Sequence, residues 1–392
     1  MAAHSIASRS LPRGSNTRLN RNPAAAWRHL DVVLIGAVVA ISLLGSLMVW
    51  TATRGPSAPY RNELFGKQLL FVVIGIGLLA VVALVDYRVF RDLALVLYGG
   101  ACALLLLVVS PLGSSSKGAQ AWFQLGTFQL QPSEFAKLGM ICLLASVASQ
   151  FQGEIDLRRM VALLGIGAVP LALIMLQPDL GTALVLVAML LGMLLVAGVP
   201  GRYLAGLVVV GAIGVVGVFH LNLLKEYQIA RLTSFTSQDV SQQENSELAK
   251  AQYPVEQSKI AIGAGGFGGQ GFGQGSQTRL GNVPEQHTDF IFTAVGEQLG
   301  FLGGGTLLAL FSIIAWRIWR TAVLARDPFG TLVCVGVLCL LMFQIFENVG
   351  MTMKIMPVTG IPLPLVSYGG SSTLAEFVAI GLVLNIHSRR FS

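Results

Sequence analysis

The chain has 392 residues, of which 54% are apolar and only 11% are Asp, Glu, Lys or Arg, against about 25% charged residues in a typical soluble domain. This composition excludes a water-soluble globular enzyme and also a disordered chain. The net charge of +7 does not indicate a nucleic-acid partner, because the basic residues stand in short clusters beside apolar segments, as orientation signals do.

Apolar runs near 20 residues recur along the whole chain, and each is long enough to cross a hydrocarbon core of about 30 Å. Lipid offers the backbone no hydrogen-bond partner and no barrel-like alternation is present, so the spans are expected to be helical. The sequence therefore predicts an all-α polytopic membrane protein with about ten transmembrane helices. They are placed at residues 30–50, 66–85, 93–110, 134–149, 160–176, 180–198, 203–220, 290–316, 329–346 and 372–388.

Lys and Arg are unevenly divided between the two sides of these spans. Residues 1–28 form a basic tail. With this tail inside, the cytoplasmic segments hold fifteen Lys or Arg residues and the short outer loops hold six. Cytoplasmic loops of membrane proteins carry such an excess. Both termini are therefore expected in the cytoplasm, with residues 29–392 forming a multi-pass membrane domain and residues 221–289 a large extracytoplasmic loop between spans seven and eight.

This long loop has a polar first half, typical of a mobile segment, and a glycine-rich second half. Eight of the thirteen residues from Gly263 to Gly275 are glycine. The run GAGGFG matches the spacing of a dinucleotide-binding loop, but such a loop needs a preceding strand and a parallel sheet. A flexible or tightly turned loop is the better interpretation.

Two polar motifs mark the outer ends of the middle spans. In QPSEFAK, Pro132 and Ser133 favour a helix start, and Glu134 and Lys137 then share one helical face. This pair is either an interfacial ion pair or part of a cavity, since ionisable groups at membrane depth are costly and usually line a site. In QPDLGT, Asp179 either caps a helix or faces the same cavity.

Two further motifs precede later spans. PEQHTDFIF brings Glu285, His287 and Asp289 together; Asp289 could cap the next helix, and the three side chains could also bind a divalent ion. The segment PVTGIPLPLVSYGGSS, residues 357–372, contains three prolines and three glycines and cannot be regular helix. Irregular backbone at membrane depth is buried in protein or lines a cavity.

In these four motifs and in their order, the chain resembles the SEDS family (shape, elongation, division and sporulation), the polytopic glycosyltransferases of bacterial cell-wall synthesis. The resemblance covers about residues 30–388. The segments MPVTGIPLP and QSKIAIGAGG are more similar to the rod-elongation branch of the family than to its division branch, whereas residues 1–28 and 236–252 fit neither.

The resemblance implies a peptidoglycan glycosyltransferase that polymerises lipid II, an undecaprenyl-pyrophosphate-linked substrate, at the outer face of the bacterial cytoplasmic membrane during elongation. It also implies a class B penicillin-binding protein as the cross-linking partner. Membrane lipids are expected to surround the helices of this chain. The family's essential loop aspartate falls on Asp289, which is expected to be catalytic. Its cavity carboxylate, lysine and second aspartate fall on Glu134, Lys137 and Asp179.

This chemistry needs a group that accepts a proton from the attacking sugar hydroxyl and cations that offset the charge on the leaving pyrophosphate. Asp289 suits the first role. Lys137 and Lys354 suit the second, as would a bound divalent cation such as Mg²⁺ or Mn²⁺. His287 is a further candidate for substrate binding.

Three alternatives stay open from the sequence. A division-type polymerase has the same motifs. A lipid II flippase or transporter also fits ten spans with Gly- and Pro-broken helices, although the polar residues gather at one face and no internal repeat is evident. A non-catalytic scaffold would not need Glu134, Lys137, Asp179 and Asp289 to converge.

Overall fold

The computed structural model describes residues 30–55, 62–116, 119–126, 128–151, 155–220, 226–233 and 247–390. The basic tail and residues 234–246 of the polar stretch lie outside the described residues. In chain order, the helices and strands are α2 (Val32–Thr53), α3 (Glu63–Leu84), α4 (Tyr87–Asp92), α5 (Ala94–Val109), β1 (Ser114–Ser116), β2 (Ala119–Leu125), β3 (Phe128–Leu130), α6 (Pro132–Ala148), α7 (Leu157–Met175), α8 (Leu180–Val196), α9 (Gly201–His220), α10 (Glu226–Thr233), α11 (Glu247–Gly265), α12 (Ser276–Leu280), α13 (Ile291–Val323), α14 (Pro328–Thr352) and α15 (Gly370–Ser388).

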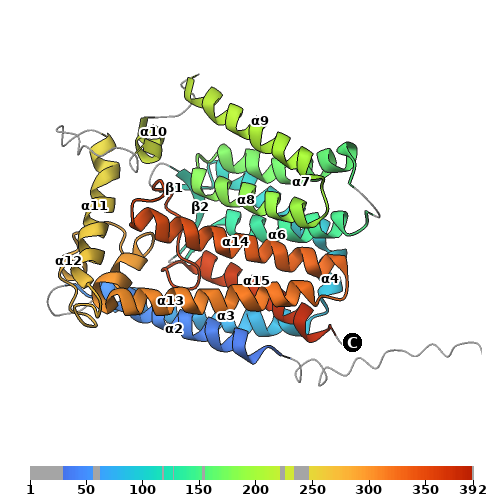
Figure 1. Ribbon diagram of the computed structural model, residues 1–392. Helices are drawn as coiled ribbons and strands as arrows, with labels where there is room; N and C mark the ends of the chain where they lie inside the picture. Colours follow the sequence, from blue (N-terminus) through green and yellow to red (C-terminus); the bar gives the residue numbers. More distant parts are fainter. Residues whose placement is uncertain are drawn as a thin grey trace, which may run out of the picture.

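The long helices run side by side in an elongated bundle (Figure 1). Each of the ten apolar ranges predicted from the sequence coincides with a helix, namely α2, α3, α5, α6, α7, α8, α9, α13, α14 or α15. Among the described residues, six of these helices are long and apolar enough to cross a membrane: α2, α3, α7, α13, α14 and α15. The predicted helical membrane architecture is confirmed.

Aspartates at the ends of the apolar runs decide where several helices begin. Asp31, Asp156, Asp179 and Asp327 each accept a hydrogen bond from the backbone N–H three residues later. These bonds satisfy N–H groups that have no partner within the helix. Pro132 begins α6 at a position where its missing N–H costs nothing.

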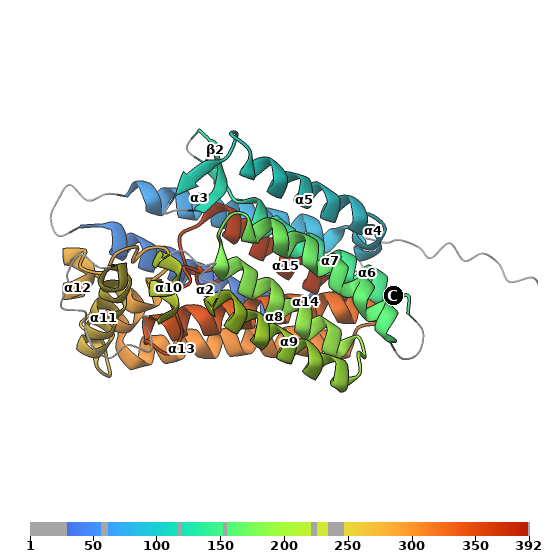
Figure 2. The same ribbon diagram turned by 90° about the horizontal axis from the view of Figure 1, so that it is seen from above.

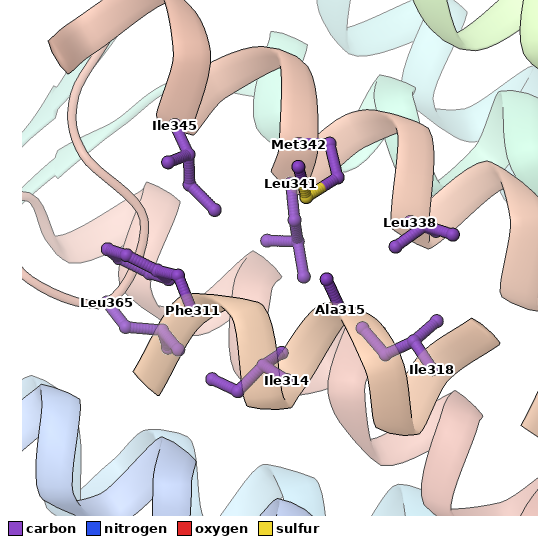
Figure 3. A pocket seen from close by; sticks show the side chains of 9 residues that line it. All are labelled: Phe311, Ile314, Ala315, Ile318, Leu338, Leu341, Met342, Ile345 and Leu365. Carbon is purple, nitrogen blue, oxygen red and sulfur yellow. The ribbon is translucent and has the colours of Figure 1, made fainter. Parts of the chain in front are cut away.

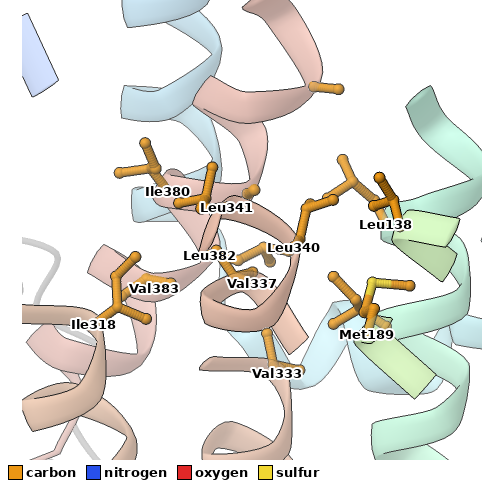
Figure 4. Close-up of a cluster of buried hydrophobic side chains, with 14 of the residues drawn as sticks. Leu138, Met189, Ile318, Val333, Val337, Leu340, Leu341, Ile380, Leu382 and Val383 are labelled. Atoms are coloured by element: carbon orange, nitrogen blue, oxygen red, sulfur yellow. The ribbon is translucent and has the colours of Figure 1, made fainter. Parts of the chain in front are cut away.

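The centre of the bundle is formed by α6, α14 and α15. In α15, 83% of the apolar stretch is buried inside the protein, compared with 28% in α7 and in α13. Figure 4 shows Leu340 of α14 and Ile380 of α15 within one cluster that also contains Leu138, Met189 and Ile318. The exposed apolar faces of the outer helices are then available to lipid.

Packing between α13 and α14 leaves one small apolar cavity of about 10 Å³ (Figure 3). Phe311 and Ile314 of α13, Leu341 and Ile345 of α14 and Leu365 are among the side chains around it. A space of this size is at the lower limit for one water molecule, and an apolar wall offers water no partner. It is a packing gap rather than a ligand site.

The start of α2 and the end of α15 lie at the same end of the bundle, which we call the terminal end. There, Arg317 of α13 lies 2.6 Å from Asp31, whose side chain is fully buried, and Arg389 lies 3.5 Å from Asp86. Figure 2 shows α4 and the C-terminus together at this end, with α11 and α12 at the opposite one. We call the opposite end the loop end.

A small antiparallel sheet with the strand order β1-β2-β3 lies towards the loop end. Phe123 pairs with Leu130 and Leu125 with Phe128, across a turn in which Gly126 has a φ of +63°. These strands were not predicted from the sequence. The run AWFQLGTFQL has the aromatic and alternating character of a hairpin, but it lies between two much stronger helical signals.

The glycine-rich stretch packs against a break in α13, where Gly300 has the non-helical angles φ 65° and ψ −161°. The N–H of Gln270 donates to the carbonyl of Glu297 over 3.0 Å, and the N–H of Phe301 donates to the carbonyl of Gly266 over 2.9 Å. The stretch is therefore held by backbone hydrogen bonds to α13. Of the interpretations from the sequence, a tightly turned loop is the one observed.

Close backbone contact explains the need for glycine here. A Cβ atom at Gly269, where φ is +81°, would lie 2.2 Å from the carbonyl oxygen of Gln298. Next to this contact, the fully buried Glu297 carboxylate accepts hydrogen bonds from the N–H groups of Gln277 and Thr278 at the start of α12, over 2.7 and 2.9 Å. Much of the predicted loop is thus folded onto the bundle.

Candidate active site

A cavity of about 490 Å³ lies at the loop end of the bundle. Its wall comes from the starts of α6, α8 and α15, from the sheet and from the segments 285–289 and 358–362. Five of the predicted site residues line it: Glu134, Lys137, Asp179, His287 and Asp289. Segments far apart in the sequence therefore meet around one polar space.

Glu134 and Lys137 form a buried ion pair in the first turns of α6. The distance from Lys137 Nζ to Glu134 Oε1 is 2.8 Å, and their side chains are 3% and 4% exposed. The start of this helix is tied to α15, because the N–H of Gln131 donates to Ser371 Oγ over 3.0 Å. The structure therefore places this buried pair in the wall of the cavity.

A further buried carboxylate interacts with this pair, and a buried amide lies in the cavity wall. Glu376 of α15 interacts electrostatically with Glu134 and Lys137 and accepts a hydrogen bond from the N–H of Leu365 over 2.6 Å. Gln344 of α14 is 1% exposed and lines the cavity, yet its side-chain amide has no hydrogen-bond partner among the described residues. Because an unsatisfied buried amide is unfavourable, this wall is suited to a polar ligand.

Asp179 combines both roles considered for it. Its carboxylate caps α8 by accepting hydrogen bonds from the N–H and the hydroxyl of Thr182, over 3.0 and 2.7 Å. The same residue lines the cavity. Capping fixes the orientation of this carboxylate while leaving it in the wall.

Asp289 lies in a tight turn immediately before α13. The N–H groups of Thr288, Asp289 and Phe290 all point to the carbonyl of Glu285, over 3.1 to 3.2 Å. Asn348 of α14 donates its side-chain amide to the carbonyl of Asp289 over 2.7 Å. The capping position of α13 is Phe290, which makes no side-chain cap, so Asp289 is not the residue that caps this helix.

The irregular segment before α15 faces Asp289. No helix forms between residues 357 and 369, as the prolines and glycines predicted. Gly360 has a φ of +75°, and a Cβ atom there would lie 3.3 Å from Asp289 Oδ2. Asn348 also donates to the carbonyl of Ile361 over 2.8 Å. One buried amide thus holds both the aspartate turn and the segment opposite it.

His287 is joined to the same segment through Tyr368. The Tyr368 N–H donates to the His287 carbonyl over 2.9 Å, and the centroids of the two rings are 5.9 Å apart. Burial raises the pKa of the Tyr368 hydroxyl. This hydroxyl therefore stays protonated at neutral pH, where it can donate or accept a hydrogen bond.

Lys354, predicted to bind substrate, is placed elsewhere. Its Nζ lies 2.6 Å from Glu256 Oε1 of α11, and it is not among the residues that line the cavity. The Lys354 ammonium holds the pKa of the Glu256 carboxyl below its usual value. The structure thus places Lys354 in an ion pair outside the cavity wall. This pairing was not foreseeable, because the residues of α11 were assigned to a loop.

Glu285, His287 and Asp289 were considered from the sequence as possible ligands of a divalent cation. Within the described ranges, no group of three or more His, Cys, Asp or Glu side chains is placed to hold a metal ion. Carboxylate and imidazole ligands must converge on one point to bind Mg²⁺ or Mn²⁺.

Some lining residues were missed by the sequence analysis. Arg231 of α10 adds a cation to the wall. In the sequence it is one of five basic residues in the long loop, and nothing distinguishes it from the others. Gln344 lies within an apolar run. A single amide in such a run does not by itself indicate a functional residue. Tyr368 and Ser371 lie in a motif that was noted for its prolines and glycines.

Comparisons with known proteins agree with this fold. Residues 30–391 match the family model described as "Cell cycle protein", which covers FtsW, RodA and SpoVE. Stage V sporulation protein E of Bacillus subtilis is 37% identical over 91% of this chain and 96% of its own length. Peptidoglycan glycosyltransferase MrdB of Escherichia coli is 34% identical over 95% and 97%, and the probable peptidoglycan glycosyltransferase FtsW of Geobacter sp. is 33% identical over 92% and 97%.

Two solved structures are similar over nearly the whole chain. A chain of a peptidoglycan synthase complex that coordinates polymerization and crosslinking is 30% identical, covers 93% of this chain and 100% of its own, and gives a TM-score of 0.78. The rod shape determining protein RodA of Thermus thermophilus is also 30% identical, covers 93% and 99%, and gives 0.68. The bundle is that of a multi-pass membrane protein. The chain belongs to the SEDS family, together with FtsW, RodA and SpoVE.

Proposed function

We propose that this protein is a peptidoglycan glycosyltransferase that polymerises lipid II at the outer face of the cytoplasmic membrane. The observation that carries the proposal is that Glu134, Lys137, Asp179 and Asp289 all line one cavity at the loop end. A scaffold would need no such convergence. The relatives named as peptidoglycan glycosyltransferases match this chain over more than nine tenths of its length.

Asp289 acts as the general base in this proposal. A sugar hydroxyl oxygen attacks the anomeric carbon of a second substrate, and its proton passes to the Asp289 carboxylate. The bond from that carbon to the lipid pyrophosphate breaks, and the pyrophosphate leaves with the bonding electrons. The turn before α13 and the amide of Asn348 keep the backbone of the base fixed during the step.

Lys137 and Arg231 stabilise the leaving pyrophosphate. Both line the cavity, and positive charge held in a partly desolvated wall offsets the charge that develops in the transition state. Glu134 keeps the Lys137 ammonium in place through the 2.8 Å contact, and Asp179 is a second substrate-binding carboxylate.

We place the loop end outside and the terminal end, with both termini, in the cytoplasm. The excess of Lys and Arg on the terminal side supports this orientation. It puts the cavity at the outer membrane surface, where the lipid tails of two substrates can stay in hydrocarbon while their headgroups meet between the helices.

For the physiological role we propose elongation and cell-shape maintenance, with a class B penicillin-binding protein as partner. The similarity to RodA and the peptidoglycan synthase complex supports this choice. The division-type role is the alternative, because FtsW is about equally similar.

The test is a gel assay for glycan polymer made from lipid II by purified protein in detergent, with and without the partner. Detergent provides no second membrane compartment, so a flippase would give no product. Polymer that appears with this protein, alone or with its partner, supports the proposal. Its absence in both cases would reject it.

A further inference from the structure

Four aromatic rings form a continuous row along one wall of the cavity. The centroids of His287 and Tyr368 are 5.9 Å apart, those of Tyr368 and Phe71 are 6.3 Å apart, and those of Phe71 and Phe128 are 5.7 Å apart. These separations lie in the range of favourable aromatic contacts. The row joins the turn before α13, the segment before α15, α3 and β3.

All four rings remain accessible from the cavity. Each is only partly buried and each lines the cavity wall. The interplanar angles are 50°, 52° and 59°, so neighbouring rings meet at a tilt. Tilted pairs do not cover each other's faces as parallel stacks do, and ring surface is left for a ligand.

The backbone of α15 makes room for one end of the row. A Cβ atom at Gly370, the first residue of α15, would lie 2.6 Å from a ring carbon of Phe128 and 3.0 Å from one of Phe71. A larger residue would push both rings away from this wall. Two aromatic side chains thus pack directly against one glycine, which indicates that the backbone of α15 is shaped to hold this row in place.

The groups beside the row favour a sugar over an alkyl chain as its occupant. Three polar residues line the same cavity. Gln129 and Thr288 directly follow Phe128 and His287 in the sequence, and Ser371 is three residues after Tyr368. A sugar presents polarised C–H groups on its faces, which the negative face of an aromatic ring attracts, and hydroxyls at its rim, which amides and hydroxyls can bind. These three side chains already form hydrogen bonds within the protein, but their hydroxyl oxygens and amide keep further donor and acceptor capacity. Sugar hydroxyls can use that capacity, whereas an alkyl chain cannot.

We propose that the row formed by His287, Tyr368, Phe71 and Phe128 is a sugar-binding wall that aligns the saccharide headgroup of the lipid-linked substrate beside Asp289. This inference rests on the proposed function and adds binding residues to it. Because His287 is two positions from Asp289, a sugar ring on this end of the wall reaches the proposed base. Phe71 and Phe128 then act on binding rather than on proton transfer.

The test replaces the rings by aliphatic side chains in Phe71→Leu and Phe128→Leu and measures KM and kcat for lipid II. The matched control is Phe346→Leu, since Phe346 of α14 is 56% exposed and is not part of the cavity wall. Each wall variant should raise KM about two- to tenfold, the range of one aromatic contact, with kcat within about twofold. Phe128→Tyr, which restores a ring, should return KM towards the wild-type value.

A second substrate separates sugar from lipid recognition. The same variants are assayed with a lipid II analogue that has a shortened prenyl chain. A sugar wall predicts the same rise in KM for both substrates. A rise that disappears with the short chain would overturn the proposal in favour of a lipid-chain groove, and an unchanged KM in folded variants, or a change equal to that of Phe346→Leu, would also overturn it. Absence of polymer from the wild-type protein would instead reject the proposed function.

Discussion

Asn348 of α14 fixes the backbone of Asp289: its side-chain amide donates to the Asp289 carbonyl over 2.7 Å and to the Ile361 carbonyl over 2.8 Å. Asn348→Ala would leave both carbonyls unsatisfied, a loss of about 1–3 kcal/mol in the free energy of unfolding. Because small displacements of a reacting group reduce rates strongly, kcat for polymer formation should fall about tenfold to a hundredfold.

The matched control for this variant is Asn385→Ala. Asn385 is equally buried and donates its amide to the carbonyls of Val82 and Val85 at the terminal end. Its side-chain oxygen also accepts hydrogen bonds from the Tyr87 N–H and from Arg389. Asn385→Ala should therefore lower the melting temperature by at least as much, while kcat of the folded protein stays near wild type. Equal loss of kcat in both variants would mean that Asn348 supports stability alone.

Single and double variants of the buried Glu134–Lys137 pair should distinguish its effect on stability from its effect on activity. Lys137→Met or Glu134→Gln alone leaves one charged group buried without its partner, which is expected to lower the free energy of unfolding by about 3–5 kcal/mol. The double variant removes both charges and should regain much of the melting temperature, but not the activity, since the cation in the cavity is absent. Recovery of polymer synthesis in the double variant would contradict the role given to Lys137.

The backbone junction between the glycine-rich stretch and α13 should be sensitive to a single methyl group. Gly269→Ala requires a left-handed backbone and meets the Gln298 carbonyl, so it should cost about 1–3 kcal/mol and expose this stretch to limited proteolysis. Gly263→Ala is the control, because a Cβ atom there meets nothing within 4 Å. If the two variants are cleaved at the same rate as wild type, the stretch is not held in the way described.

The Lys354–Glu256 pair predicts a specific pH dependence. Lys354 lowers the pKa of Glu256. The pair therefore contributes its full share to the free energy of unfolding above the ordinary glutamate pKa of about 4.3. This contribution is lost as the pH falls through the lowered pKa. Both groups are partly exposed, which limits the effect to about 1 kcal/mol or less. Melting temperatures of wild type and Lys354→Met should converge at acidic pH and differ at neutral pH, with polymer synthesis little changed. A large loss of synthesis would return Lys354 to the site.

The helices were predictable from the sequence because a membrane restricts the backbone conformations that an apolar run can adopt. Apolar runs without backbone partners in lipid become helices, and aspartates such as Asp179 and Asp327 mark their starts. The polar motifs were predictable in the same way, since charged residues beside apolar runs are expensive unless they serve a purpose.

The remaining features depend on contacts between distant segments. Glu376 lies in an apolar run and shows its relation to Lys137 only when α15 packs beside α6. Lys354 is paired with Glu256 of α11, a helix that was not predicted because its surroundings are polar and glycine-rich. The row of rings draws on four segments, so Phe71 and Phe128 carried no signal of their own.

The most direct test of the account is polymer synthesis from lipid II by Asp289→Asn protein whose expression and melting temperature match wild type. Asparagine keeps the size of the side chain and the turn before α13 but cannot accept the hydroxyl proton as a carboxylate does. General acid–base catalysis contributes about 10²–10⁴-fold, and we expect product to fall by at least the lower end of that range. Near-normal polymer from this variant would contradict the assignment of Asp289 as the base.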